Sequence, residues 1–222
     1  VWWHVVYADN TYEGGSIPDI QIQDQMRVLN GDYAPSGISW KLAGVQRVQN
    51  ADWFLNTDQA DEREFNMKRS LRKGGMDTLN VYTVSFRNTS DADLLGYSYL
   101  PQQADAVLDG IVIQYGTLPG GFQRPYNLGR TLTHEVGHWL GLYHTFEGGC
   151  SGIGDSVDDT PPQKAATAGC PIFRDTCRSG NLDAISNFMD YSTDVCMDSF
   201  SPGQTARMHD QISFFRSGKQ TS

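Results

Sequence analysis

Residues 134–144, HEVGHWLGLYH, contain three of the five histidines of the chain. Residues four positions apart share one face of a helix, so His134 and His138 can present two imidazoles to one metal ion. Gly141 can adopt the left-handed conformation that ends a helix, so His144 can return to the same ion. Three imidazoles and one open position are typical of catalytic zinc, whereas a structural zinc has four protein ligands.

The glutamate in this stretch, Glu135, would lie beside the metal. Zinc lowers the pKa of a coordinated water from about 15.7 to about 7, and a nearby carboxylate can accept the proton and pass it to a leaving amine. This arrangement predicts hydrolytic chemistry. The alternative is a helix with surface histidines, but the extension of HExxH to HExxHxxGxxH favours a metal site.

The length and net charge of the chain limit its number of domains and its kinds of partner. A chain of 222 residues and 24.7 kDa fits one large domain or two tightly joined subdomains. Its net charge of -9, from 26 acidic and 17 basic residues, would repel polyphosphates and anionic membrane surfaces, so we expect no nucleic-acid or membrane partner. No apolar run approaches the roughly 18 residues of a membrane span, and VWWHVVYADN lacks the features of a signal peptide. We expect a soluble, monomeric, mature protein.

Alternation of apolar residues predicts strands that alternate with helices. The expected strands are 1–7, 38–48, 78–86, 94–100 and 109–115, and the expected helices are 18–33, 58–73 and 202–215. This order is typical of an α/β (α+β) fold with a mostly parallel sheet. Beyond His144 the chain is rich in Gly, Pro, Asp and Ser, which predicts irregular structure. We therefore divide one catalytic domain into subdomains 1–144 and 145–222.

All four cysteines, Cys150, Cys170, Cys177 and Cys196, lie in the last third and form no C-x-x-C pair. Two disulfides are the simplest interpretation, although the sequence leaves three pairings open. Disulfides indicate an oxidising compartment. A glycosylation sequon at Asn88 is consistent with secretion.

The extended histidine motif resembles that of the metzincin metallopeptidases, which place a methionine-containing turn beneath the zinc. SNFMDY, residues 186–191, resembles this turn. TLTHEVGHWLGLYHTFEGGC, GDSVDDTPPQ, NFMDYSTDVCMDSFSPGQ and LLGYSYLP are similar to the pappalysin family, particularly its extracellular fungal and bacterial members. The resemblance spans essentially the whole chain. It implies a metzincin-like catalytic domain with a twisted mixed sheet, an active-site helix and an irregular disulfide-bonded C-terminal subdomain.

The resemblance also implies roles for individual residues. One zinc ion would be bound by three histidines, His134, His138 and His144. Glu135 would be the general base and acid, and Met189 would form an apolar floor below the ligands. Tyr191 resembles a tyrosine that some metzincins use as a movable ligand or oxyanion donor; a simple packed tyrosine is the alternative. The implied disulfides are crossed, Cys150 with Cys177 and Cys170 with Cys196.

The loop GDSVDDT concentrates oxygen ligands of the kind that calcium prefers. With the resemblance, we expect a structural calcium ion held by Asp155, Asp158 and Thr160, with backbone carbonyls supplying other ligands. A solvated acidic loop is the alternative.

Substrate contacts are expected at two places. Leu95, Gly96 and Tyr97 fit an edge strand that binds an extended peptide, although an ordinary interior strand is the alternative. In metzincins the segment after the methionine turn lines the pocket for the side chain that follows the cleaved bond. Strand-like alternation lets only one of two neighbours face this pocket, and we favour Val195 over Asp194. This choice predicts an apolar residue after the cleaved bond.

These observations predict a secreted zinc endopeptidase that acts on proteins or peptides. One alternative is a catalytically silent, zinc-containing secreted binding module. A zinc hydrolase of small amides or esters is another. Glu135 favours an enzyme, because a structural zinc has no use for a carboxylate at the open position, and an edge strand favours a polypeptide substrate. His4 and His209 lie far from the motif and are expected to be structural.

Overall fold

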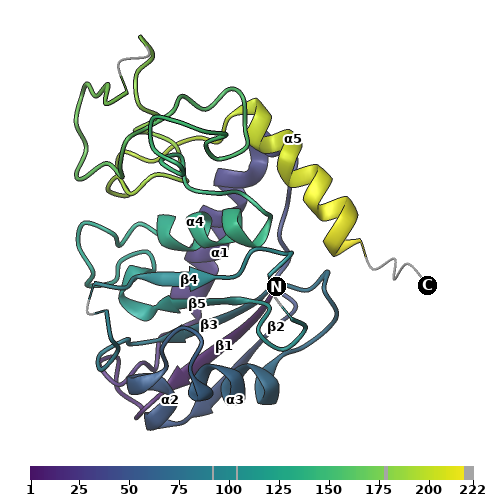
Figure 1. Cartoon of the computed structure of the whole chain (residues 1–222). Helices are drawn as coiled ribbons and strands as arrows, with labels where there is room; N and C mark the ends of the chain where they lie inside the picture. The colour runs from purple at the N-terminus through teal and green to yellow at the C-terminus, as the bar shows by residue number, and fades with distance from the viewer. Residues whose placement is uncertain (92, 104, 178–179, 218–222) are drawn as a thin grey trace.

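A five-stranded mixed sheet organises the first half of the chain (Figure 1). The computed structural model describes residues 1–91, 93–103, 105–177 and 180–217. The strand order is β2-β1-β3-β5-β4. The strands are β1 (Trp2–Tyr7), β2 (Gly44–Gln49), β3 (Asn80–Val84), β4 (Gly96–Ser98) and β5 (Ile111–Gln114). All neighbours are parallel except β4, which is antiparallel to β5 and forms one edge of the sheet.

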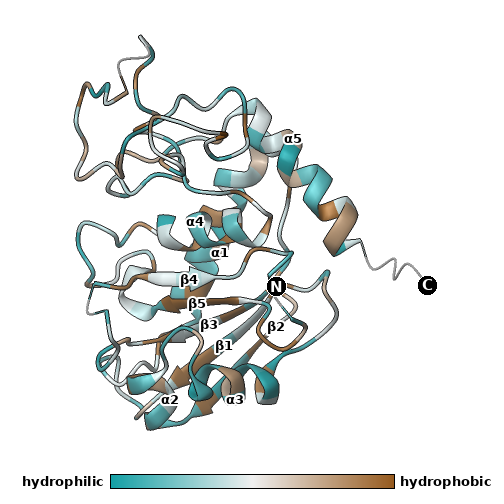
Figure 2. Ribbon diagram, in the orientation of Figure 1, coloured by the Kyte–Doolittle hydropathy of each residue, from teal (hydrophilic) through white to brown (hydrophobic). Residues whose placement is uncertain are grey.

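The central strands are buried on both faces because helices cover both faces of the sheet. Every residue of β3, and Ile111 to Ile113 of β5, is buried. Figure 2 shows these strands in the colours of hydrophobic residues. Parallel strands between two helical layers read as continuous runs of β-branched and aromatic residues rather than as alternating patterns. The buried residues of β3 and β5 therefore show that the sheet is the inner layer, between two layers of helices.

Helices cover the two faces of the sheet (Figure 1). Helix α2 packs against β1 and β3, and α4 packs against β4 and β5. Helix α3 adjoins α2, while α1 adjoins α4. The helices are α1 (Asp19–Tyr33), α2 (Ala51–Asn56), α3 (Glu62–Leu71), α4 (Arg130–Trp139) and α5 (Pro202–Gln211), with short 3-10 turns at Ala34–Ser36 and Tyr115–Thr117 and a π-helical turn at Ile212–Arg216. The strand–helix fold and the closing helix predicted from the sequence are confirmed.

Several boundaries differ from the prediction. The predicted strand 38–48 begins only at Gly44, and α2 was not predicted. The predicted helix 58–73 is shorter because Asp61 accepts a hydrogen bond from the main-chain N–H of Glu64 and caps the first turn. Helix α5 starts with a capping box in which Ser201 and Gln204 satisfy each other's main-chain N–H groups.

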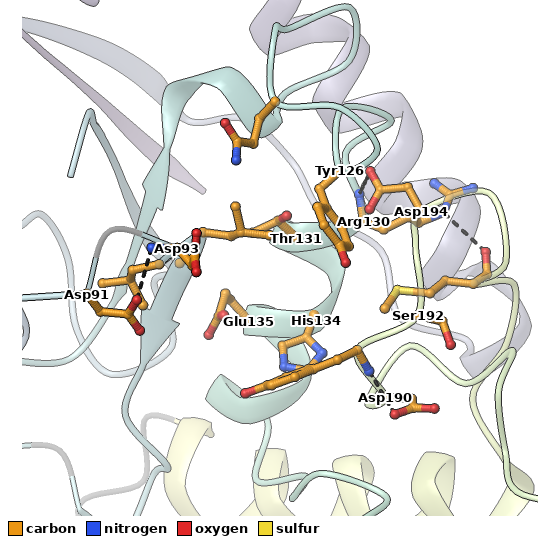
Figure 3. A pocket seen from close by; sticks show the side chains of 16 residues that line it. Asp91, Asp93, Tyr126, Arg130, Thr131, His134, Glu135, Asp190, Ser192 and Asp194 are labelled. Atoms are coloured by element: carbon orange, nitrogen blue, oxygen red, sulfur yellow. Dashed lines mark hydrogen bonds between the residues drawn. The ribbon is translucent and has the colours of Figure 1, made fainter. Parts of the chain in front are cut away.

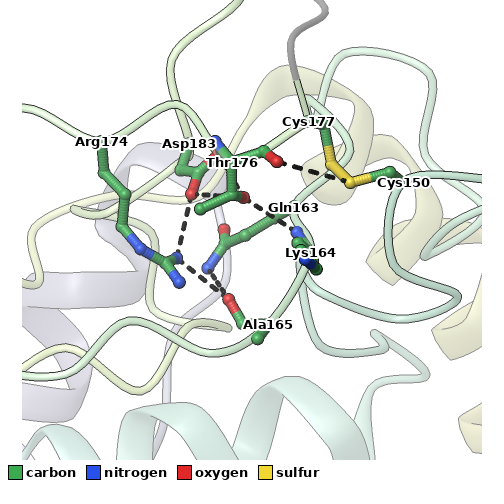
Figure 4. Close-up of a disulfide and its surroundings, with 8 residues drawn as sticks. All are labelled: Cys150, Gln163, Lys164, Ala165, Arg174, Thr176, Cys177 and Asp183. Atoms are coloured by element: carbon green, nitrogen blue, oxygen red, sulfur yellow. Dashed lines mark hydrogen bonds and ion pairs between the residues drawn. A yellow bond between two sulfur atoms is a disulfide. The ribbon is translucent and has the colours of Figure 1, made fainter.

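The C-terminal part consists mainly of irregular segments held by disulfides and polar contacts. Cys150 is bonded to Cys177 and Cys170 to Cys196, the crossed pairing that the family resemblance implies. Near the first bond, the buried Asp183 carboxylate forms an ion pair with Arg174 at 2.9 Å (Figure 4). These links supplement the few buried apolar side chains of the segment, among them Phe188, Met189 and Met208.

A buried charge cluster joins the end of the described chain to the motif helix α4. Arg216 forms an ion pair with Asp109 at 2.7 Å, donates to the carbonyl of Trp139 at 3.0 Å, and stacks over the Trp139 ring. Trp139 is the last residue of α4, so this contact supplies a donor for a helix-end carbonyl. Across the described ranges, no helix has the length and hydropathy that a membrane span requires.

Candidate active site

Three glycines determine the two ends of helix α4 and its close contact with the methionine turn. Gly129 precedes the helix with φ +92°, and Gly141 follows it with φ +88°, both in the left-handed region. Gly137 faces the methionine turn: a Cβ atom there would lie 2.3 Å from the Met189 sulfur. The Met189 sulfur can therefore approach the helix backbone, and the role of Met189 as an apolar floor below the ligands stays a prediction.

The three motif histidines converge on one point. Nε2 of His138 lies 3.1 Å from Nε2 of His134 and 3.0 Å from Nε2 of His144. Zinc binds imidazole nitrogen at about 2.0–2.1 Å, so two tetrahedral ligands would be about 3.3 Å apart, close to the spacing observed. In the part of the chain that the structure describes, this is the one group of three or more His, Cys, Asp or Glu side chains close enough to share an ion.

Main-chain carbonyls orient two of these rings. Nδ1 of His134 lies 2.7 Å from the carbonyl oxygen of Phe188, and Nδ1 of His138 lies 2.8 Å from that of Leu142. A carbonyl only accepts, so each Nδ1 carries the proton and donates, and each Nε2 lone pair is free to bind a metal.

Burial keeps the rings neutral. It lowers the pKa of His138 to about 4 and that of His144 to about 3, and it places the pKa of His134 well below its usual value. Neutral imidazole is the ligand form. The donor atoms, their spacing and their protonation state therefore fit zinc.

Glu135 is buried beside this centre. Burial raises the pKa of its carboxyl group to about 8, and a hydrogen bond with Ser98 opposes the rise. The Oε2 atom lies 3.1 Å from the Ser98 hydroxyl. A zinc ion would favour the carboxylate form of Glu135, because an opposite charge within about 4–6 Å lowers the pKa of a carboxyl group.

Tyr191 lies beside the ligands. The centroid of its ring is 5.6 Å from that of His134 and 4.9 Å from that of His144. It also packs against Phe146, at 5.0 Å. Burial raises the pKa of its phenol to about 12, so the hydroxyl keeps its proton and can donate. This position is compatible both with an oxyanion donor and with a packing role.

A pocket of about 520 Å³ lies beside the first half of helix α4. Figure 3 shows His134 and Glu135 projecting into it from α4, with Asp91 and Asp93 at one end and Asp194 beside Arg130 at the other. Its walls come from the edge strand, α4 and the segment after the methionine turn: Asp91, Asp93, Leu94, Leu95, Gly96, Gln123, Tyr126, Arg130, Thr131, His134, Glu135, Asp190, Tyr191, Ser192, Asp194 and Met197.

The chain matches known proteins over most of its length. The sequence model of the peptidase family described as "Pregnancy-associated plasma protein-A" matches residues 77–213. The extracellular metalloprotease of Pyricularia oryzae is 49% identical over 220 residues, which cover 97% of this chain and 75% of that protein. Extracellular metalloprotease 1 of Coccidioides posadasii is 46% identical, with 98% and 78% covered. This chain belongs to the pappalysin family.

Solved structures agree with this assignment. Mature mirolysin of Tannerella forsythia, in complex with a cleaved peptide, superposes with a TM-score of 0.77 at 33% identity and covers 96% of this chain and 90% of that chain. Mirolysin in complex with "compound 9" gives a TM-score of 0.79 at 32% identity and covers 96% of this chain and 90% of that chain. The pappalysin described here is a secreted metalloprotease, and its histidine cluster supports one zinc ion.

Two expected substrate contacts are corrected by the geometry. The Tyr97 side chain is 4% exposed and does not line the pocket; it packs between Phe86 and Tyr99 on the other face of β4. Side chains alternate along a strand, so Gly96 and Ser98 face α4 while Tyr97 faces away. The strand itself is at the sheet edge, and Leu95 and Gly96 line the pocket; their contact with substrate stays a prediction.

The expectation that Val195 lines the pocket is wrong. Val195 is 76% exposed, whereas Asp194 is 3% exposed and lines the pocket. Residues 194–196 form a turn, closed by a bond from the N–H of Cys196 to the carbonyl of Thr193, so strand alternation does not apply. Asp194 is held inward by the main-chain N–H of Leu128 at 2.7 Å.

The acidic loop only partly assembles the predicted calcium ligands. Thr160 donates to Oδ1 of Asp155 at 2.7 Å, while Oδ2 of Asp155 is buried without a hydrogen-bond partner. Asp158 is exposed. Its neighbour Asp159 instead accepts from Ser201 and from the first turn of α5. Asn88 is exposed, as a glycosylation site requires, and its use stays a prediction.

Sequence reasoning did not identify Ser98 or Arg130 as site residues. Arg130 lies at the start of α4 and pairs with Asp32 at 3.0 Å. Ser98 could have been predicted from the sequence, because it lies two positions after Gly96 on the same strand and its side chain therefore points to the same face.

We expect His138→Ala to abolish zinc binding, because it removes one of three ligands whose nitrogens must converge. Metal analysis of the purified protein should fall from about one zinc per chain to near zero. His209→Gln is the matched control, since His209 bonds to the carbonyl of Ser36 away from the centre. Full zinc content in His138→Ala would exclude this ligand set.

Proposed function

We propose that this pappalysin is a zinc-dependent endopeptidase in which Glu135 moves the protons of peptide hydrolysis. One observation carries the proposal: three neutral imidazoles converge on one point with a buried carboxyl group beside them. When bound, zinc polarises the substrate carbonyl and acidifies a water molecule. The chain's own residues must then hold the substrate and transfer protons.

Glu135 is placed to act as base and then as acid. Its carboxyl group borders the pocket next to His134, so it can accept a proton from the attacking water and deliver it to the leaving nitrogen. Burial favours delivery, because it raises the pKa of the carboxyl group to about 8 and makes the protonated form accessible near neutral pH. Tyr191 is the candidate donor to the developing oxyanion.

The edge strand β4 supports a polypeptide substrate. Its one sheet neighbour among the described strands is β5, so its other edge presents unpaired main-chain N–H and C=O groups beside Gly96. An extended peptide can add to such an edge through main-chain hydrogen bonds, whatever its sequence. This favours internal cleavage of proteins over hydrolysis of small amides. A silent binding module would gain nothing from burying Glu135, which costs free energy.

We expect Glu135→Gln to lower kcat for peptide hydrolysis by at least about 10²- to 10⁴-fold while zinc content stays unchanged, because the ligands remain and the proton carrier is lost. Tyr191→Phe should lose at most about 10²- to 10³-fold. Kinetics on an internally quenched peptide, with zinc analysis of each variant, measures both effects. Near-native turnover in Glu135→Gln would remove this residue from the mechanism.

Asp194 supplies the basis for a specificity that differs from the apolar preference predicted from the sequence. Its buried carboxyl group lies in the pocket, and Asp91 and Asp93 add negative charge at the other end. Arg130 offsets part of the charge of Asp194. A carboxylate in a pocket selects a cationic side chain, since a buried positive charge needs a partner. We therefore propose Lys or Arg after the cleaved bond.

In Asp194→Asn, we expect the preference for Lys or Arg to fall roughly 10- to 100-fold, because a hydrogen bond to a charged group becomes a neutral one. Cleavage sites in a complex peptide mixture report this directly. Val195→Ser is the matched control and should leave the profile unchanged, because this neighbour is exposed. A native preference that is apolar would refute the role of Asp194.

A calcium ion at the 155–160 loop remains a proposal. Support comes from the buried Oδ2 atom of Asp155, which lacks a partner. A calcium-selective chelator that leaves zinc in place should lower the thermal midpoint, since a ligand bound to the native state adds RT ln(1 + [L]/Kd) to stability. Asp155→Asn should abolish this response, whereas Asp175→Asn, an exposed control, should keep it. An unchanged midpoint for the native protein would count against the site.

A further inference from the structure

Strand β4 contacts Glu135 at two points. On one side of the side chain, the absence of a Cβ at Gly96 leaves room for Glu135, whose Cγ would lie only 3.1 Å from such an atom. On the other, the Ser98 hydroxyl lies 3.1 Å from Oε2 of the carboxyl group. Gly96 and Ser98 face α4 together because they are two residues apart on one strand. The substrate-binding strand thus also restrains Glu135.

The Ser98 hydroxyl is the hydrogen-bond partner of this carboxyl group within the described residues. Its oxygen also lies 2.9 Å from the main-chain carbonyl oxygen of Glu135. A hydroxyl carries one proton and can donate and accept at once. The Ser98 hydroxyl therefore lies within hydrogen-bond distance of two oxygens of Glu135, one on the side chain and one on the main chain, and it links the carboxyl group to strand β4.

We propose that Ser98 is a positioning residue that holds the carboxyl group of Glu135 in its reactive orientation. This inference rests on the proposed function of Glu135 as proton carrier. A side chain buried without a partner would lose hydrogen-bond energy, and a freely rotating carboxyl group would spend less time aligned with the water and the leaving nitrogen. The Ser98 hydroxyl gives the carboxyl group a hydrogen-bond partner and limits its rotation. Ser98 belongs to the strand that we propose aligns the substrate.

The test compares two variants that have the same shape and differ in the hydroxyl, Ser98→Val and Ser98→Thr. We expect Ser98→Val to lower kcat about 10-fold with KM within about twofold, as is common for a lost orienting hydrogen bond, and Ser98→Thr to recover most of kcat. Ser98→Ala repeats the loss without added bulk. Zinc content and the thermal midpoint show that each variant is folded and loaded.

Ser85→Ala is the control for stability alone. Ser85 is buried, donates to the carbonyl of Phe54 at 2.8 Å and is not among the residues that line the pocket, so its loss should lower the midpoint and leave kcat unchanged. A second readout does not depend on turnover. In crystal structures of Ser98→Val and Ser98→Ala, the Glu135 carboxyl group should occupy more than one orientation, whereas Ser98→Thr should show one.

Equal kcat in Ser98→Val, Ser98→Ala and the native enzyme would overturn the proposal. A single native orientation of Glu135 in both variants that lack the hydroxyl would do the same. A change in KM alone would also overturn it, because that would place Ser98 in substrate binding. If Glu135→Gln itself keeps native turnover, the proposed function fails first. If Glu135→Gln is inactive and Ser98→Val is native, Ser98 alone is refuted.

Discussion

The hydrogen bond from Nδ1 of His134 to the carbonyl of Phe188 is the contact on which the site depends. It fixes which nitrogen of the ring can bind a metal, and it joins helix α4 to the residue before Met189. Gly137 allows this approach, because any side chain there would collide with the methionine sulfur. The helix therefore cannot present its ligands correctly unless the irregular C-terminal segment is folded beneath it.

The disulfides and buried ion pairs hold the C-terminal segment in the position that helix α4 requires. A segment with little regular structure cannot hold Phe188 in place through an apolar core alone, and Cys170–Cys196 closes the chain around the methionine turn. At the last residue of α4, Arg216 donates a hydrogen bond to the Trp139 carbonyl and so stabilises the end of the helix. The methionine turn and the end of the described chain thus both stabilise α4, and the edge strand β4 packs against the same helix from the side of the sheet.

Some of this site could be predicted from sequence because its signals are local. The spacing of His134, His138 and Gly141 defines a helix, its end and a ligand set within eleven residues of the motif. The edge position of residues 94–100 could also be inferred. The pocket residue could not, because Asp194 is turned inward by long-range main-chain donors near Leu128, which the sequence does not reveal. Tyr97 was misplaced because side chains alternate along a strand, so Gly96 borders the pocket while the Tyr97 side chain packs on the opposite face.

In the site that we propose, three imidazole nitrogens and no sulfur hold the zinc. X-ray absorption spectroscopy of the zinc-loaded enzyme distinguishes this ligand set from others. We expect three imidazole nitrogens at about 2.0–2.1 Å and a light atom, nitrogen or oxygen, at the remaining position. A sulfur shell at about 2.3 Å, or four imidazoles, would contradict it.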